Sequence, residues 1–330
     1  MEQKQHAGIK RFAVIAMLAA AIVSLALLAG CQSSQPAELP SQKIETEASD
    51  IAEGVPADPF YVLLVGNDSR TGTVEITKSE YADGNARSDT MMLARIDPQT
   101  YKVTLITVPR DTTIDLNGSP AKLNNAYQAG GIEASVEQVE LLTGVKIDYY
   151  FDLGFVTFQK FVDALGGLSV NVPITMEMQD IVGGGDISVA AGQQDLNGAE
   201  ALVVARTRKA FAVDQDACRQ IQDRALVAAA ISEVAQDSGM IDTAVAALMD
   251  NAETNMSSDV LKQLVTSFAD NAGSLTIYQA TGPYGGDINP TTGEWLATRD
   301  EATWQQIIAT ADAGEDPSGI VALPQIIPAG

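Results

Sequence analysis

The sequence predicts a single α/β domain in which helices pack in layers against a central sheet. Three observations lead to this fold class. Residues 60–66 form a continuous apolar run, FYVLLVG, which is typical of a strand covered on both faces. Strand-like and helix-like patterns then follow in mixed order to about residue 312. Hydrophobic residues make up 46% of the 330-residue chain, which is enough for a sizeable core.

The apolar segments that follow predict a hairpin. Residues 90–96 and 102–108 flank Asp97-Pro98-Gln99-Thr100, and Asp-Pro is a common start of a turn. Further strands are expected at 168–172 and 274–279, with helices near 133–143, 155–165, 197–205, 219–236, 240–250, 257–270 and 301–312. Residues 174–196, which contain Gly183-Gly184-Gly185, are expected to form a long surface loop that could act as a lid.

Residues 1–31 predict export from the cell. Basic residues precede the apolar run 12–30, which ends in Leu28-Ala29-Gly30-Cys31. This ending resembles a bacterial lipobox, in which Cys31 would be acylated, but the run is also long enough to be an uncleaved membrane anchor. Both alternatives tether the rest of the chain to the extracellular face of the bacterial cell membrane.

The remainder of the chain divides into three parts. Residues 32–57 are rich in Ser, Gln, Glu and Pro and predict a flexible tether, because they cannot bury enough apolar surface to become ordered. Residues 58–316 carry the predicted strands and helices and form the functional domain. The short tail 317–330 contains proline and is expected to be frayed.

The composition excludes several classes of function. The net charge of -23 argues against a nucleic-acid partner, because phosphate backbones require a basic face. The only histidine, His6, precedes the apolar run, so the folded part has no imidazole for a Ser-His-Asp or Cys-His nucleophile. Cys31 and Cys218 are the only cysteines, which excludes a zinc cluster. Any metal is expected to be a hard cation held by carboxylates.

Eight of the ten arginines lie in two windows of the sequence, which indicates an anionic ligand. The first window holds Arg70, Arg87, Arg95 and Arg110, and the second holds Arg206, Arg208, Arg219 and Arg224. Arginine presents a planar fork that matches phosphate oxygens and keeps its charge when desolvated. Surface ion pairs are the alternative, and Arg95 in particular is expected to be solvated because strand alternation turns it away from the others.

The predicted hairpin brings part of the first window together. Arg87 precedes strand 90–96 and Arg110 follows strand 102–108, so antiparallel pairing places both at one edge of the sheet. Residues 67–70 reach the same edge if strand 60–66 runs parallel to 102–108. Open α/β sheets commonly bind ligands beyond the ends of their strands.

Two acids, Asp68 and Asp89, are expected at this edge as well. A carboxylate beside an arginine is often only a salt bridge. Two carboxylates that meet at one place can instead hold Mg²⁺, which takes one or two protein carboxylates together with phosphate oxygens and water. The spacing of the two acids leaves both alternatives open.

The combination of motifs resembles the LytR-CpsA-Psr family of bacterial cell-wall phosphotransferases. The matching segments are VGNDSR (65–70), ARSDTMML (86–93), TVPRDT (107–112), KLNNAY (122–127), DYYFDLGF (148–155), VDALGGLSVNV (162–172), LNGAEALVVARTR (196–208) and DQDACRQIQDR (214–224). They occur in unbroken order over about residues 60–235. The resemblance implies a single-domain, three-layer α/β/α sandwich with a mixed central sheet.

The resemblance also implies an activity and roles for individual residues. The enzyme would transfer a phospho-glycopolymer, such as teichoic acid or capsule, from a polyprenyl-pyrophosphate lipid to a muramic-acid hydroxyl of peptidoglycan. Asp68 and Asp89 fall on the positions that bind Mg²⁺, with Mn²⁺ as a possible substitute. Arg87, Arg110, Arg206, Arg208 and Arg219 fall on pyrophosphate-binding positions, and Arg70 and Lys122 lie in the same motifs. The expected catalytic residues are Asp89, Arg110, Arg206 and Arg208.

The sequence departs from the family pattern at two places. The family pattern is Asp-Phe-Gly-Arg-x-x-Arg-Gln. In this sequence Gln222 replaces the second Arg and Asp223 replaces the Gln, so one phosphate contact is expected to be lost. Arg224 follows directly but is rotated by roughly 100° along a helix, so we do not expect it to replace that contact. The lipobox is the second departure, because a membrane-spanning anchor is usual in the family. A polyprenyl-pyrophosphate hydrolase and a non-catalytic lipoprotein that binds wall polymers stay open as alternative functions.

Overall fold

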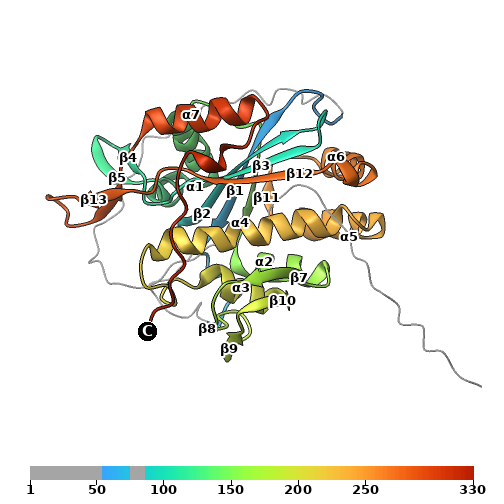
Figure 1. The fold of residues 1–330 in the computed structure, drawn as a ribbon, viewed down its shortest axis with the longest axis horizontal. Helices are drawn as coiled ribbons and strands as arrows, with labels where there is room; N and C mark the ends of the chain where they lie inside the picture. Colours follow the sequence, from blue (N-terminus) through green and yellow to red (C-terminus); the bar gives the residue numbers. More distant parts are fainter. Residues whose placement is uncertain (1–53, 75–85) are drawn as a thin grey trace, which may run out of the picture.

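The computed structural model describes residues 54–74 and 86–330 (Figure 1). The predicted export segment, Cys31 and the tether up to residue 53 lie outside the described residues. Within the described ranges, no helix has both the length and the apolar character needed to cross a membrane.

A mixed sheet of six strands forms the centre of the molecule, with the order β11-β6-β1-β2-β3-β12. Its strands are β1 (Phe60–Asn67), β2 (Ser88–Asp97), β3 (Lys102–Thr107), β6 (Tyr149–Leu153), β11 (Glu253–Thr254) and β12 (Thr276–Thr281). The pairs β1–β2, β2–β3 and β11–β6 are antiparallel, whereas β1–β6 and β3–β12 are parallel. The predicted hairpin is therefore confirmed, and β1 runs parallel to β3.

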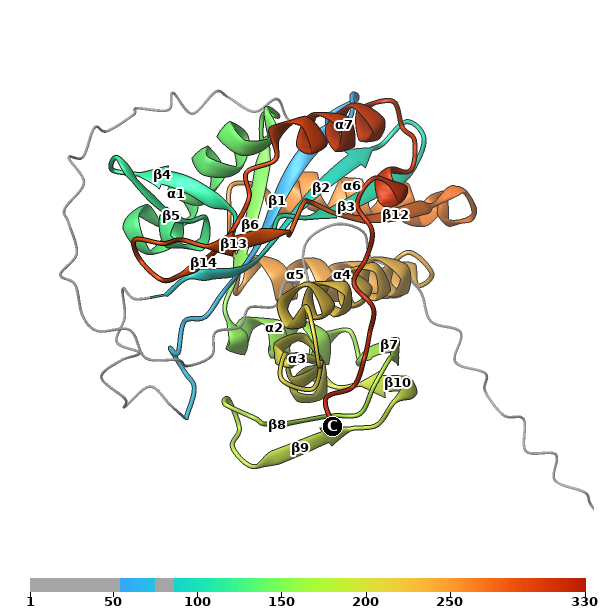
Figure 2. The same cartoon turned by 60° about the vertical axis from the view of Figure 1, so that its left-hand side comes forward.

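Helices cover both faces of the sheet, as Figure 2 shows. One face carries α1 (Asn124–Thr143) and α7 (Glu301–Asp312). The other face carries α2 (Phe155–Ala164), α3 (Gly198–Arg206), α4 (Gln215–Val234), α5 (Ile241–Met249) and α6 (Ser258–Asp270). Successive residues of β1 alternate between the two cores: Val62 and Leu64 pack on the α4 side, whereas Leu63 and Val65 pack on the α1 side. This explains the unbroken apolar run and confirms the α/β/α sandwich.

The prediction of a long loop over residues 174–196 is wrong, because this segment forms strands. β8 (Met176–Gln179) pairs with β9 (Asp186–Val189), and β10 (Gly192–Leu196) pairs with β7 (Leu168–Val172). Gly184 and Gly185 have φ of 80° and 90°, which glycine adopts without strain, and they turn the chain tightly between β8 and β9. Asp180 fixes the turn by accepting hydrogen bonds from the backbone N–H groups of Val182 and Gly183.

The prediction of a frayed tail after residue 316 is also wrong. The N–H of Ala212 donates to Ile327 O at 2.8 Å, and the N–H of Ala329 donates to Ala210 O at 2.7 Å. The chain end is thus held against the segment that joins α3 to α4. A sequence of small and proline residues does not reveal such long-range pairing.

Arg95 is buried, against the prediction that it is solvated. Its Nε donates to Asp312 Oδ1 at 3.0 Å, at the end of α7. It lies near the end of β2 that is remote from Arg87 and Arg110, and α7 covers this part of the sheet and supplies a carboxylate.

Several short elements were not predicted. They are the central-sheet strands β6 and β11, the hairpin of β4 (Thr113–Leu116) and β5 (Ser119–Lys122), the hairpin of β13 (Gly286–Ile288) and β14 (Trp295–Ala297), and 3₁₀ turns at Ser238–Met240, Ala272–Ser274 and Pro317–Gly319. Helix α1 also begins earlier than expected, at Asn124 rather than near residue 133. Its first turns are offset by a kink at Gly130 and Gly131, which hides the helical period in the sequence.

Candidate functional site

The site lies at the sheet edge where β1 and β3 end and β2 begins. Asp68 follows β1 directly, and the side-chain Oδ1 of Asn67 accepts a hydrogen bond from Ser69 N at 3.0 Å, which turns the chain after the strand. The N–H of Asp68 donates to Arg87 O at 3.1 Å, and the N–H of Arg87 donates to Asp68 Oδ1 at 2.7 Å. These bonds fix the end of β1 beside the start of β2. The predicted meeting of Asp68, Arg87 and Arg110 at one edge is confirmed.

Asp89 is the buried carboxylate at the centre of this edge. Its Oδ1 accepts hydrogen bonds from Arg110 Nη1 at 2.7 Å and from Asn124 Nδ2 at 3.0 Å. Its Oδ2 is buried and accepts no hydrogen bond from the residues that the structure describes. A buried carboxylate oxygen without a donor is costly, so this atom is suited to a cation that comes with a ligand.

Asp68 complements Asp89. Burial raises the pKa of Asp68 to about 6, and the negative charge of Asp89 adds to the effect. Two carboxylates whose negative charges repel each other attract a divalent cation. Within the described ranges, no three His, Cys, Asp or Glu residues are grouped so that they could hold a metal by themselves. A metal at the Asp68–Asp89 pair would need further oxygens from its ligand, and Mg²⁺ commonly takes these from phosphate.

Both arginine windows converge on Asp216, in the first turn of α4. Its Oδ1 lies 3.2 Å from Arg110 Nε, 3.3 Å from Arg208 Nε and 3.2 Å from Arg219 Nη2. Burial works to raise the pKa of Asp216, but the charges of these three arginines outweigh it and hold the pKa well below its usual range. Asp216 is not among the site residues predicted from the sequence. The available signal was an acid three residues before Arg219 on the predicted helix.

Arg219 is fully buried and fixed on all sides. Its Nη1 lies 2.6 Å from Asp223 Oδ2 and donates to Thr90 Oγ1 at 2.7 Å, while its Nη2 donates to Asp89 O at 2.9 Å. Asp223, which departs from the family pattern, therefore holds Arg219 in place. Arg224 donates to Thr107 Oγ1 at the end of β3, away from Asp216, as its rotation along α4 predicted.

Arg70 and Arg206 lie on the aromatic ring of Phe155. Their guanidinium carbons are 4.9 Å and 5.2 Å from the ring centroid, and both side chains are almost fully buried. Such cation–π contacts are stronger when desolvated. Arg206 Nη1 also donates to Gln179 O at 3.2 Å, which connects β8 to the site.

The remaining predicted residues, Lys122 and Arg87, contact the site less directly. Lys122 Nζ lies 2.7 Å from Asp111 Oδ1, and Asp111 Oδ2 lies 3.9 Å from Arg110 Nε. The side chain of Arg87 is exposed, so only its backbone is fixed at Asp68. Asp89, Arg110, Arg208 and Arg219 thus form one contact network around Asp216, with Lys122 at its margin.

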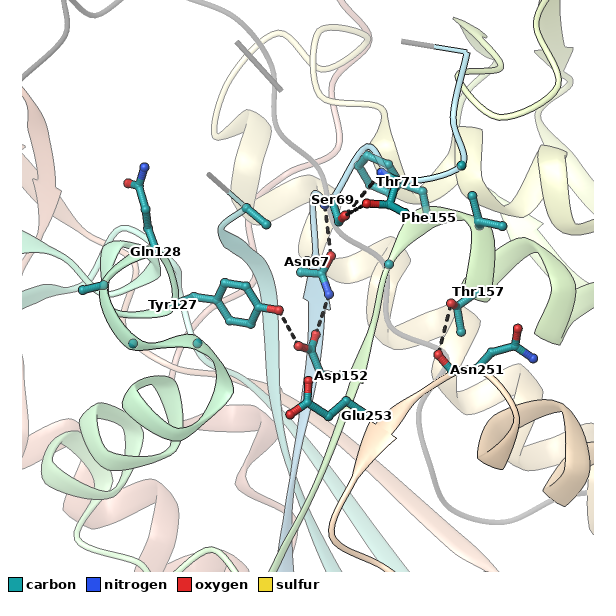
Figure 3. Close-up of a pocket in the computed structure, with 17 residues that line it drawn as sticks. Asn67, Ser69, Thr71, Tyr127, Gln128, Asp152, Phe155, Thr157, Asn251 and Glu253 are labelled. Carbon is teal, nitrogen blue, oxygen red and sulfur yellow. Dashed lines mark hydrogen bonds between the residues drawn. The ribbon is translucent and has the colours of Figure 1, made fainter. Parts of the chain in front are cut away.

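A cavity of about 700 Å³ adjoins the Asp68 side of the site (Figure 3). Asp152, at the end of β6, accepts hydrogen bonds from Asn67 Nδ2 at 2.8 Å and from Tyr127 Oη at 2.5 Å. Burial raises the pKa of Asp152 to about 6, against the lowering effect of these two hydrogen bonds. Phe155 lines the cavity as well, and its ring also contacts Arg70 and Arg206. Tyr127 and Asp152 stand in two of the quoted motifs, but sequence reasoning gave them no role.

Comparison with known proteins identifies the family. The sequence profile of the LytR-CpsA-Psr family matches residues 29–309. The chain belongs to the LytR-CpsA-Psr family. This membership agrees with the order of motifs and with the α/β/α sandwich.

Similar members of the LytR-CpsA-Psr family have names that state an activity. The polyisoprenyl-teichoic acid–peptidoglycan teichoic acid transferase TagU of Oceanobacillus iheyensis is 31% identical over 243 residues, which cover 70% of this chain and 69% of TagU. The TagU of Bacillus licheniformis is 27% identical over 256 residues, which cover 76% of each chain.

Solved structures of the family share the fold. The crystal structure of Bacillus subtilis TagV superposes with a TM-score of 0.64 at 25% identity, and the match covers 80% of this chain and all of TagV. The structure of TagT bound to LI-WTA superposes with a TM-score of 0.57 at 22% identity, covering 78% of this chain and 91% of TagT. At that identity the similarity to TagT concerns the fold alone.

Proposed function

We propose that this protein transfers a phospho-glycopolymer of the teichoic acid or capsule type from a polyprenyl-pyrophosphate lipid to peptidoglycan. The observation that supports this most directly is the convergence of Arg110, Arg208 and Arg219 beside the carboxylate pair Asp68–Asp89. The relatives TagU of two organisms are named as teichoic acid transferases that act on peptidoglycan. Three guanidinium groups around one carboxylate provide the positive charge that a pyrophosphate requires.

Phosphate binding would follow from the chemistry of these arginines. Arg219 is fully buried and its donors are used within the protein, so it would contribute charge and not a direct contact. Arg110 and Arg208 each present several N–H donors in a plane, and Asp216 uses only part of them. A pyrophosphate carries several acceptor oxygens, so it can bind these two groups from the open side or replace Asp216 as their partner. Burial strengthens these interactions, because the local dielectric is lower than in water.

The reaction would be a single displacement at phosphorus. The acceptor hydroxyl oxygen forms a bond to the phosphorus that carries the glycopolymer, and the bond from that phosphorus to the bridging pyrophosphate oxygen breaks. The lipid phosphate leaves with the electron pair, and the hydroxyl proton passes to a carboxylate of the Asp68–Asp89 pair. Such a transfer depends mainly on positioning and charge stabilisation, and Arg110, Arg206 and Arg208 would supply the charge.

A divalent cation fits the Asp68–Asp89 pair. Two features support it: Oδ2 of Asp89 accepts no hydrogen bond from the described part of the chain, and the pKa of Asp68 is raised. Bound Mg²⁺, or Mn²⁺ in its place, would neutralise charge on the phosphate oxygens. Oxygen ligands suit both ions.

The cellular setting is the extracellular face of the bacterial membrane. The basic and apolar residues before Cys31, which lie outside the described residues, support a lipid anchor or a single span. An anchor keeps the site close to a lipid-linked donor and raises its effective concentration.

One incubation separates this function from its alternatives. The full-length protein is combined with a polyprenyl-pyrophosphate-linked glycopolymer, a peptidoglycan oligomer and Mg²⁺. Polymer covalently linked to peptidoglycan is the expected product. Free phosphorylated glycan would instead mean hydrolysis of the pyrophosphate, and donor binding without turnover would mean a binding module.

A further inference from the structure

The cavity beside Asp68 has no assigned ligand. We propose that it binds the sugar of the acceptor, an uncharged glycan ring of peptidoglycan, and presents its hydroxyl toward the Asp68–Asp89 pair. This inference rests on the proposed function, because it names the place of the second substrate. The cavity volume of about 700 Å³ is large enough for a disaccharide-sized ligand.

The polar lining of the cavity suits a hydroxylated ligand. In Figure 3 the side chains of Asn67, Tyr127 and Asp152 form a hydrogen-bonded group on one wall. Asp152 is only 4% exposed, and its two oxygens accept from Tyr127 and Asn67, which fixes its orientation. The phenol oxygen of Tyr127 can still accept a hydrogen bond, and Ser69 adds a hydroxyl nearby. A sugar ring offers alternating donors and acceptors that match such a set.

The cavity borders the arginines at Phe155. Phe155 lines the cavity but is only 1% exposed. The same ring carries Arg70 and Arg206, with their guanidinium carbons 4.9 Å and 5.2 Å from its centroid. Phe155 therefore borders both the cavity and the two arginines, so a sugar in the cavity would lie next to a pyrophosphate at the arginines.

The acidic lining of the cavity favours the acceptor glycan over the donor polymer, which are the two sources of sugar in the reaction. Asp152 and Glu253 both line it, and the charge of Glu253 contributes to the raised pKa of Asp152. No lysine or arginine is among the described residues that line this cavity. A teichoic-acid-type donor polymer carries phosphates, which these acids repel. The acceptor glycan, with its muramic carboxyl linked to peptide, has no such charge on its ring.

The cavity also lies where an acceptor must lie. Asn67 and Ser69 line it and flank Asp68 in sequence, and Ala86 lines it next to Arg87. Tyr127 Oη donates to Asp152, which also accepts from Asn67, the residue before Asp68. A hydroxyl held by Tyr127 would thus lie on the Asp68 side of the cavity.

The test measures binding of a GlcNAc–MurNAc-peptide disaccharide to the full-length protein by NMR, without donor lipid. Tyr127→Phe removes the hydroxyl, and Ala129→Trp, on an exposed lining residue of α1, narrows the cavity. The matched controls are Tyr278→Phe on β12 and Ala302→Trp on the exposed surface of α7. We expect both cavity variants to weaken disaccharide binding at least tenfold, whereas the controls bind like the wild type. Binding of inorganic pyrophosphate should change less than twofold in all four variants.

The outcomes separate this inference from the proposed function. If the protein transfers polymer and the cavity variants transfer it as fast as the wild type, the acceptor site is elsewhere and the inference is wrong. If the variants lose disaccharide binding but the wild type transfers nothing from any lipid donor, the sugar site stands and the proposed function fails. Displacement of the disaccharide by a glycerol-phosphate oligomer would assign the cavity to the donor polymer and overturn the inference.

Discussion

Arg110 and Arg208 contact the same carboxylate oxygen, Oδ1 of Asp216, at 3.2 Å and 3.3 Å. One follows β3 and the other follows α3, so the two arginine windows of the sequence meet at one point of the fold. Asp216 thereby keeps like-charged side chains together in a largely buried place, where they would otherwise repel each other. We infer that the site is already organised before an anionic ligand binds.

Arg110 is the residue whose removal should harm transfer most. Arg110→Ala removes the charged partner of Asp89 and one of the three guanidinium groups at Asp216, so we expect polymer transfer to fall about 100-fold. Arg110→Lys keeps the charge but not the planar fork, so its transfer rate should lie between those of the wild type and Arg110→Ala. Transfer rates with lipid-linked donor give the effect, and circular dichroism checks the fold. A folded Arg110→Ala protein with wild-type transfer would remove the residue from the mechanism.

Metal binding can be measured apart from activity. Asp68→Asn and Asp89→Asn should each weaken Mn²⁺ binding at least tenfold in calorimetry, because each removes a charged oxygen ligand of the proposed site. Asp186→Asn on exposed β9 is the matched control and should bind like the wild type. Removing the metal with EDTA should stop transfer, and added Mg²⁺ should restore it. Unchanged Mn²⁺ affinity in both site variants would contradict a metal at this pair.

Asp216 should stabilise the fold in a pH-dependent way. Asp216→Asn leaves three arginines without their shared charge, so we expect the free energy of unfolding at pH 7 to fall by about 3 kcal/mol. The pKa of Asp216 is lowered in the folded state, so its contribution is present above about pH 4, the ordinary pKa, and is lost as the pH falls below it. Denaturant unfolding should therefore show that the difference in free energy of unfolding between the wild type and Asp216→Asn shrinks between pH 5 and pH 3. A pH-independent difference would mean that charge is not the cause.

The contribution of Asp152 to the free energy of unfolding should depend on pH in the opposite direction. Its folded pKa of about 6 lies above the usual 3.8, so its contribution to stability is present at low pH and is lost as the pH rises through 6. The free energy of unfolding of the wild type relative to Asp152→Asn should fall by about 2 kcal/mol between pH 4 and pH 7. The same denaturant series measures it, with Asp186→Asn as the reference. A constant difference between the two proteins over this range would refute the raised pKa.

The sequence predicted the parts of the fold that depend on local pattern. The continuous apolar run before Asn67 indicated a strand buried on both faces, and Asp97-Pro98 indicated the hairpin of β2 and β3. Pairing within that hairpin placed Asp89 and Arg110 at one edge, because antiparallel strands bring the start of one beside the end of the other. The glycines after residue 182 do not reveal the hairpin they form, since glycine serves a tight hairpin and a long loop equally well.

Taken by itself, the sequence determined the family, the layered fold and the concentration of arginines at the ends of strands and helices, because these follow from residue type and local order. Only the tertiary structure decided which partners those arginines have. Asp216, Asp223 and the Tyr127–Asp152 pair acquire their contacts through packing of elements that are distant along the chain. A side chain's neighbours across an interface depend on the rotation and position of whole helices and strands, and no local pattern encodes them.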